Sequence, residues 1–264
     1  MKLAISNIAW DVEASQVAYM RMKQYGFTGL EIAPTKIFNP DPYSEDHVKG
    51  VRALKEVLDK ALGLSIISMQ SIWYGRSESI WGSDADRQTL LDYTAQAAAF
   101  AEAAGCPNLV FGCPRNRNKP EGADDAVAEE FFRAAADTCA AHNTVLALEP
   151  NPPIYNTNFL NTTAECAAFL RKLDHPALRM NLDMGTMIEN REDVELVREN
   201  LDLIHHIHVS RPGLAPVQPL ALHRRLARVL HDGRYDGWVS IEMKETTLKN
   251  VCAAMETVVR SFDA

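Results

Sequence analysis

Four short stretches decide the fold: VLALEP (145–150), LRMNLDM (178–184), LIHHIHVS (203–210) and WVSIEMK (238–244). Each is a mainly apolar run with the length of a buried β-strand, and a segment with helical spacing follows each one. Each also carries an acidic or imidazole side chain near its end, namely Glu149, Asp183, His208 and Glu242. If the strands lie side by side and parallel, these side chains converge at one rim.

The same alternation of apolar runs and helical spacing extends over the whole chain. The earlier apolar runs are KLAISNIAW (2–10), GLEIAP (29–34), LSIISMQSI (64–72) and NLVFGC (108–113). Helical spacing predicts helices over 15–26, 46–63, 87–105, 126–143, 163–173, 193–202, 221–237 and 248–262. Eight strand–helix units in 264 residues match a (β/α)8 barrel. We therefore expect an α/β protein with one TIM-barrel domain over residues 1–264. A doubly wound sheet would carry a glycine-rich turn after its first strand, and the segment DVEASQ has no glycine.

Composition limits the classes of partner and the compartment. The net charge is −8, with 27 basic and 35 acidic residues, which argues against nucleic acid or an anionic membrane as the main partner.

The five cysteines are odd in number and form no CxxC pair, as is typical of buried thiols in a reducing compartment. The N-terminus lacks a secretory apolar region, and no window reaches about 18 apolar residues. We expect a cytoplasmic protein.

The four residues at the strand ends favour a metal site. Taken singly, Glu149 could be solvated, Asp183 could cap a helix, Glu242 could pair with Lys244, and His208 could be a core imidazole. Together, three carboxylates and one imidazole at one rim would repel each other and lose hydration unless a divalent cation held them. The set is rich in oxygen, with one nitrogen and no thiolate. Such a set suits Mn²⁺ or Mg²⁺, with Co²⁺ or Zn²⁺ as alternative occupants.

Other residues expected at the same rim are candidates for contacts with a substrate. They are Glu31 in LEIAP, Gln70 in SMQS and the cluster Arg115, Arg117 and Lys119 after NLVFGC. Strand alternation separates His205 from the pair His206 and His208, so a second imidazole should face the same side as the ligand. The structural alternative is that the histidines are core residues and the arginines face solvent.

At these residues the chain resembles a known superfamily. The motifs LEP (148–150), D-x-G (183–185), HxHVS (206–210) and SIEMK (240–244) resemble the xylose isomerase-like TIM barrels, in particular the sugar phosphate isomerase/epimerase branch with the ketose 3-epimerases. The resemblance covers the whole chain. It implies that Glu149 and Glu242 are the catalytic residues for proton transfer as well as metal ligands, together with Asp183 and His208. It also implies a homodimer or homotetramer.

The activity implied by the resemblance is that of a metal-dependent sugar isomerase or epimerase, which acts on a sugar, sugar acid or sugar phosphate. A divalent ion chelated by the carbonyl oxygen and the neighbouring hydroxyl of a sugar acidifies the adjacent C–H and stabilises the enediolate. Return of the proton to the opposite face gives epimerisation, and return to the neighbouring carbon gives aldose–ketose isomerisation. The expected partner is therefore a small-molecule carbohydrate.

Two residues depart from the pattern of the family. Thr186 stands three positions after Asp183, where family members commonly carry histidine, and its hydroxyl can hydrogen-bond a sugar oxygen. Arg211 follows HVS, where many relatives carry an acidic residue. Together with Arg115 and Arg117, Arg211 could bind an acidic sugar or a phosphate, or it could face solvent.

Other functions use the same barrel. A metal-dependent dehydratase of an inosose or shikimate-type acid would need a general acid, for which His206 or His223 could serve. The DNA-repair endonucleases of the superfamily need further histidines on the early strands, which this chain lacks. A non-catalytic binding protein would be expected to have lost at least one ligand. We expect an isomerase.

Overall fold

The strands close into a barrel, as the sequence predicts. A computed structural model describes residues 1–262. The eight parallel strands pair in chain order, and the last strand pairs with the first. They are β1 (Lys2–Ser6), β2 (Gly29–Ile32), β3 (Ser65–Met69), β4 (Asn108–Phe111), β5 (Val145–Leu148), β6 (Leu178–Asp183), β7 (Ile204–Val209) and β8 (Trp238–Ile241). The (β/α)8 fold is confirmed.

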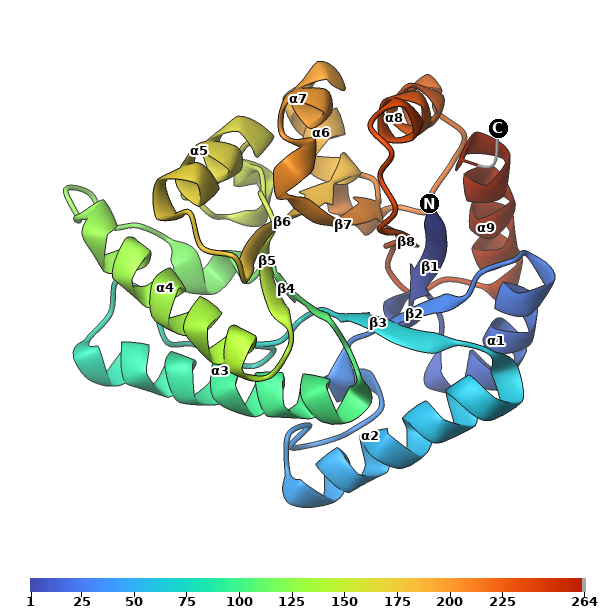
Figure 1. The fold of residues 1–264 in the computed structure, drawn as a ribbon, viewed down its shortest axis with the longest axis horizontal. Coiled ribbons are helices and arrows are strands. Elements are labelled where there is room, and N and C mark those ends of the chain that lie inside the picture. Colours follow the sequence, from blue (N-terminus) through green and yellow to red (C-terminus); the bar gives the residue numbers. More distant parts are fainter. Residues whose placement is uncertain (263–264) are drawn as a thin grey trace.

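The helices form an outer ring around the strands, and β1 lies next to β8 near the end of the chain (Figure 1). They are α1 (Ser15–Gln24), α2 (Glu45–Val57), α3 (Asp84–Ala104), α4 (Asp125–Ala141), α5 (Thr163–Leu173), α6 (Met184–Asn190), α7 (Glu195–Glu199), α8 (Ala221–Asp232) and α9 (Leu248–Phe262). The segment predicted as one helix over 193–202 contains only α7. The short α6 begins directly after β6 and was not predicted.

Local sequence explains several helix ends. The Ser44 side chain accepts a hydrogen bond at the start of α2, and Thr162 forms a capping box with Glu165 at the start of α5. Gly63 and Gly105 follow helices with φ of 66° and 65°, a left-handed conformation that glycine adopts without strain. These signals divide the chain into its strand–helix units.

The interior of the barrel is more polar than a typical core of branched apolar residues. The Gln70 amide donates to the Ser6 hydroxyl over 2.5 Å, and the Asn108 amide donates to the Ser68 hydroxyl over 2.9 Å. All four side chains are buried, and buried polar groups cost free energy unless they are hydrogen-bonded. Hydrogen bonds between side chains of nearby strands therefore fix these inward-facing groups. Among residues 1–262, no helix is long and apolar enough to cross a membrane.

Gly29 marks a close contact between β2 and its neighbours. A Cβ atom at this position would lie 2.6 Å from the Trp238 ring and 2.8 Å from the Ala4 Cβ atom. We expect Gly29→Ala to lower the free energy of unfolding by about 1–3 kcal/mol, because an extra methyl group in a packed site forces its neighbours apart. Urea unfolding measures the change. The double variant Gly29→Ala/Trp238→Leu should recover part of the loss, and an unchanged single variant would contradict this packing.

Candidate metal centre

The four predicted ligands meet at the C-terminal ends of their strands. Glu149 directly follows β5, Asp183 ends β6, His208 lies in β7 and Glu242 directly follows β8. Each offers one ligand atom, and these atoms lie within 4.8 Å of one another. The residues are between 0% and 8% exposed. The structure thus brings together side chains that are up to 93 positions apart in the sequence, by the difference between 242 and 149.

His208 is at the centre of this cluster. Its Nδ1 atom lies 2.9 Å from Glu149 Oε1 and 3.3 Å from Glu242 Oε2. Asp183 is its register partner on the neighbouring strand. His206 and His208 both contact Glu31, so they face the same side, as strand alternation predicts. His205 hydrogen-bonds Asn108 in the barrel interior, so its predicted separation from the other two histidines is wrong. The register between β6 and β7 shifts at this point, which breaks the strict alternation.

The Asp183 carboxylate is fixed by its own helix and by β7. The Ser210 hydroxyl donates to Oδ1, and the Thr186 backbone N–H donates to Oδ2 over 2.7 Å. The Thr186 hydroxyl lies 2.7 Å from the Pro150 carbonyl oxygen and 2.9 Å from Asp183 Oδ2. Thr186 is fully buried, so in this structure it orients Asp183 and is not at the cavity surface. Asp183 caps α6 as well.

Amide and guanidinium groups surround Glu149. Asn181 donates to Oε1 over 2.6 Å, and Asn151 donates to Oε2 over 3.0 Å. Behind the carboxylate, Arg117 donates from Nη1 to the Glu149 backbone oxygen over 2.8 Å. Arg117 is fully buried, and burial lowers its pKa to about 10. A buried cation next to an acidic cluster offsets part of its negative charge.

Burial and mutual repulsion raise the pKa values of Glu242 and Asp183, whereas contacts lower that of Glu149. Burial raises the pKa of Glu242 to about 7, with the charges of Glu149 and Asp183 adding to it. Burial and the charge of Glu149 also raise the pKa of Asp183. For Glu149 and His208, contacts outweigh burial: His208 and Asn151 lower the pKa of Glu149, while Glu242 and other carboxylates raise that of His208.

A cavity of about 200 Å³ opens above three of the ligands. Its lining residues are Gln70, Ser71, Val110, Gly112, Cys113, Pro114, Glu149, Asn151, Tyr155, Asp183, Leu214 and Glu242. Gln70, predicted to contact a substrate, is therefore at the cavity surface. The polar lining can hydrogen-bond hydroxyl groups, and the only charged lining residues are the carboxylates of the candidate metal centre.

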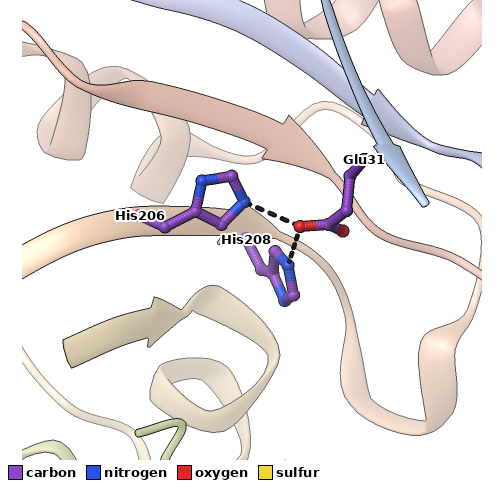
Figure 2. Close-up of side chains that lie close together, drawn as sticks. All are labelled: Glu31, His206 and His208. Carbon is purple, nitrogen blue, oxygen red and sulfur yellow. Dashed lines mark hydrogen bonds and ion pairs between the residues drawn. The ribbon is translucent and has the colours of Figure 1, made fainter. Parts of the chain in front are cut away.

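The other predicted contact residues do not line this cavity. Arg115 is exposed, and Arg211 donates to the Pro216 carbonyl oxygen over 3.3 Å. Glu31 and His206 are 0% and 1% exposed and lie together in the interior, in contact with His208 (Figure 2). Of the predicted basic cluster, only Arg117 folds inward, and it contacts the backbone of Glu149.

The sequence interpretation did not include two residues that contact the cluster. Asn181 lies two positions before Asp183, and Ser210 lies two positions after His208. Since side chains two positions apart on a strand share a face, alternation alone indicates that both face the cluster. No local pattern indicates that their partners would be Glu149 and Asp183, because those residues come from other strands.

The donor set fits a hard divalent ion. Three carboxylates and the Nδ1 atom of one imidazole converge in a buried place, as such ions prefer. Burial and the charges of Glu149 and Asp183 raise the pKa of Glu242 to about 7. A divalent cation among the carboxylates would oppose both effects and favour the ionised form. Thus the residues present are suited to hold a metal ion.

Comparison with known proteins gives the family. The model of the family described as xylose isomerase-like TIM barrel matches residues 20–260. The chain belongs to this family. A human protein named "Putative hydroxypyruvate isomerase" is 28% identical over 258 residues, which cover 90% of this chain and 87% of the relative.

Two solved structures share the whole fold. The 3-keto-D-glucoside 4-epimerase of E. coli has a TM-score of 0.78 at 19% identity, over 100% of both chains. The D-psicose 3-epimerase of Clostridium cellulolyticum, determined with D-tagatose, has a TM-score of 0.80 at 14% identity, over 99% of both chains. The relatives support the prediction that this xylose isomerase-like barrel is an isomerase or epimerase.

The carboxylate cluster predicts an unusual pH dependence for the metal-free barrel. The raised pKa values of Glu242, Asp183 and His208 mean that these three groups bind more protons in the folded than in the unfolded chain above about pH 4.5, so their contribution to stability declines as the pH rises. The lowered pKa values of His205, His206 and His223 oppose this decline below about pH 6.5. For Glu242 alone, a shift from 4.5 to about 7 corresponds to at most roughly 3 kcal/mol. The lowered pKa values of Glu31 and Glu149 contribute stability that is lost only as the pH falls below about 4.5.

Urea unfolding of chelator-treated protein between about pH 5 and pH 8 measures this decline. Glu242→Gln should reduce the slope, since the amide does not ionise. Excess Mn²⁺ should remove the decline, because the ion replaces the bound protons. A pH dependence of stability in Glu242→Gln that equals that of the wild-type protein would contradict the assignment.

Proposed function

We propose that the chain is a divalent-metal-dependent isomerase or epimerase of a small α-hydroxycarbonyl compound. The observation that supports it is the buried convergence of Glu149, Asp183, His208 and Glu242, three of which line a cavity that mixes polar and apolar side chains. Both the family and the human relative, whose name refers to a hydroxypyruvate isomerase, agree with this type of reaction.

In this proposal the four residues hold Mn²⁺ or Mg²⁺, as their oxygen-rich donor set favours. When bound, a divalent ion polarises the carbonyl group of a substrate and makes the neighbouring C–H more acidic. The roles of the protein side chains are to orient the substrate and to move one proton.

Glu149 and Glu242 are placed to move that proton. Both line the cavity, and they come from β5 and β8, which are separated in the barrel by β6 and β7. The two carboxylates thus approach a bound substrate from different directions. If one removes the proton and the other returns it to the opposite face, the carbon is epimerised. If the proton returns to the neighbouring carbon, the carbonyl group moves and the reaction is an isomerisation.

The environments of these two carboxyl groups differ. Although burial favours protonation, hydrogen bonds and charge from His208, with Asn151 and Arg117, keep the pKa of Glu149 low. Burial and neighbouring anions raise that of Glu242 to about 7. A bound ion would favour the ionised form of both groups. We therefore assign proton removal and proton return to Glu149 and Glu242 as a pair, and the direction of the reaction decides which of them acts first.

The cavity favours a short and uncharged substrate. Its volume of about 200 Å³ suits a small polyol, and neither Arg115 nor Arg211 lines it. An anionic group placed there would meet the carboxylates without a side-chain cation to pair with. A neutral ketose avoids this cost, whereas a phosphorylated sugar does not.

The dehydratase alternative is less well supported. That reaction needs a general acid next to the leaving hydroxyl group, and His206 and His223 were the candidates. His206 and His223 are 1% and 0% exposed, and neither lines the cavity. An isomerase or epimerase needs no further acid beyond the two carboxyl groups.

Replacing either proton-transfer residue should abolish the reaction. We expect Glu149→Gln and Glu242→Gln each to reduce turnover by roughly a thousandfold or more, because general acid–base catalysis contributes about 10²–10⁴-fold and each residue also contacts the ion. The measurement is the incorporation of deuterium from D₂O into each ketose of a panel in the presence of Mn²⁺. The deuterium is detected by NMR after the Mn²⁺ has been removed. Glu245→Gln is the control, because Glu245 is an exposed partner of Lys36. Near-normal exchange in either cavity variant would reject the assignment.

The same panel tests the substrate class. Neutral ketoses should show kcat/KM values at least about tenfold above those of the corresponding phosphates, a difference of roughly 1.4 kcal/mol. Hydroxypyruvate belongs in the panel as a three-carbon α-hydroxycarbonyl compound that carries one carboxylate. Faster turnover of a phosphorylated sugar, with loss of that preference in Arg211→Ala, would show that Arg211 binds the anion and that the neutral-substrate proposal is wrong.

A further inference from the structure

Below the candidate ligands, one carboxylate joins two imidazoles. The Glu31 side chain comes from β2 and points at His206 and His208 on β7 (Figure 2). Its Oε2 atom lies 2.8 Å from His206 Nε2 and 3.0 Å from His208 Nε2. Both distances are those of ordinary N–H···O hydrogen bonds. One oxygen therefore accepts from two rings.

This carboxylate is separated from the cavity. Glu31 and His208 are 0% exposed, and His206 is 1% exposed. Neither Glu31 nor His206 lines the cavity. The second oxygen, Oε1, has no hydrogen-bond partner among the described residues. A buried carboxylate is costly without a cation or several donors, so a purely structural role would be better served by an apolar side chain.

The contact with Glu31 requires a proton on Nε2 of His208. A carboxylate oxygen only accepts hydrogen bonds, so each Nε2 atom that faces Glu31 must be the donor. The opposite nitrogen of His208, Nδ1, faces the carboxylates of Glu149 and Glu242 at 2.9 Å and 3.3 Å, so by the same argument it also donates when no ion is bound. A divalent ion held among these carboxylates would replace the Nδ1 proton and meet the lone pair of that nitrogen, while the Nε2 proton stays directed at Glu31.

We propose that Glu31 is a positioning residue that holds His208 with Nε2 protonated and with the Nδ1 lone pair directed at the divalent ion, and that His206 anchors Glu31. This inference rests on the proposed function, in which the four-residue site holds that ion. Carboxylates that accept from the outer nitrogen of a metal-binding histidine fix its tautomer and orientation and raise its basicity. Glu31 does not contact the substrate.

Binding of Mn²⁺ alone tests the role of Glu31 without any substrate. We expect Glu31→Gln to weaken Mn²⁺ binding by roughly 10–100-fold in calorimetry, because the amide is a poorer acceptor and can present an NH₂ group to one of the rings. The stoichiometry should stay at about one ion per chain. Two ions per wild-type chain would show instead that Glu31, His206 and His208 form a second metal site, and would overturn the proposal.

A double variant separates positioning from a general loss of structure. In a His208→Ala background the effect of Glu31→Gln on Mn²⁺ affinity should vanish, since Glu31 would have no ligand to orient. Asn108→Ala is a matched control, because it breaks buried hydrogen bonds to Ser68 and to His205, neither of which is a candidate ligand, and it should leave Mn²⁺ affinity unchanged. An equal loss of affinity in Asn108→Ala, or a loss from Glu31→Gln that persists without His208, would reject the positioning role.

The tautomer can be observed directly. In protein with ¹⁵N-labelled histidine and bound Mg²⁺, long-range ¹H–¹⁵N spectra should show both His206 and His208 protonated at Nε2. Assignment is made with His206→Gln. His208 should lose its single tautomer in Glu31→Gln and recover it in Glu31→Asp, which keeps a carboxylate and remains informative if the Gln variant folds poorly. A proton on His208 Nδ1 in the Mg²⁺-loaded wild-type protein would overturn the proposal.

The outcomes distinguish this inference from the proposed function. If the wild-type protein binds Mn²⁺ and exchanges substrate protons, but Glu31→Gln binds Mn²⁺ with unchanged affinity, only the role of Glu31 is wrong. If the wild-type protein binds no divalent ion, both the metal-dependent function and the positioning role of Glu31 are wrong.

Discussion

The imidazole of His208 contacts three carboxylates that come from different strands, and this contact constrains the rest of the site. Nδ1 faces Glu149 and Glu242, while Nε2 faces Glu31. Because all of these groups are buried, a shift of any one strand would leave an anion without its partner, at a cost of several kcal/mol. The contact therefore ties β2, β5, β7 and β8 together across the barrel. It also means that the register of these strands is fixed by polar contacts inside the barrel as well as by the apolar packing between the strands and the surrounding helices.

The same burial of several carboxylates at one place destabilises the folded chain when no ion is bound. Arg117 is the buried cation that lies behind Glu149, and amide or hydroxyl donors satisfy part of the remaining charge. Burial, with the charges of Glu149 and Asp183, still raises the pKa of Glu242 to about 7. Functional sites commonly retain such conflicts between stability and activity. An ion that binds only the folded chain would relieve the conflict and stabilise the barrel by mass action.

Much of the fold and the convergence of Glu149, Asp183, His208 and Glu242 could be predicted from the sequence, because parallel buried strands give continuous apolar runs and their C-terminal ends meet at one rim. The short helix α6 could not be predicted, because its first residues continue the apolar run of β6. Asp183 is both the last residue of β6 and the N-cap of α6. Depth was also not predictable: Glu31 and His206 were expected at the rim and lie in the interior. The arginines show a third limit. PRNRNK (114–119) does not indicate which side chain folds inward, since Arg117 is selected by a carbonyl group 32 positions away.

The inward position of Arg117 affects which ligands the cavity can bind. Arg117 lies behind Glu149. Its positive charge therefore stabilises the carboxylates, but a ligand in the cavity cannot form an ion pair with it. Arg115 and Arg211 lie outside the lining. The negative charge at the cavity floor therefore comes from Glu149, Asp183 and Glu242. A divalent ion would neutralise most of this charge and would leave no excess positive charge to attract an anionic substrate. A second anion from a phosphorylated substrate would restore the imbalance, whereas hydroxyl groups would be met by Gln70 and Asn151. The buried position of one arginine thus links the folding of the loop after β4 to the choice of substrate.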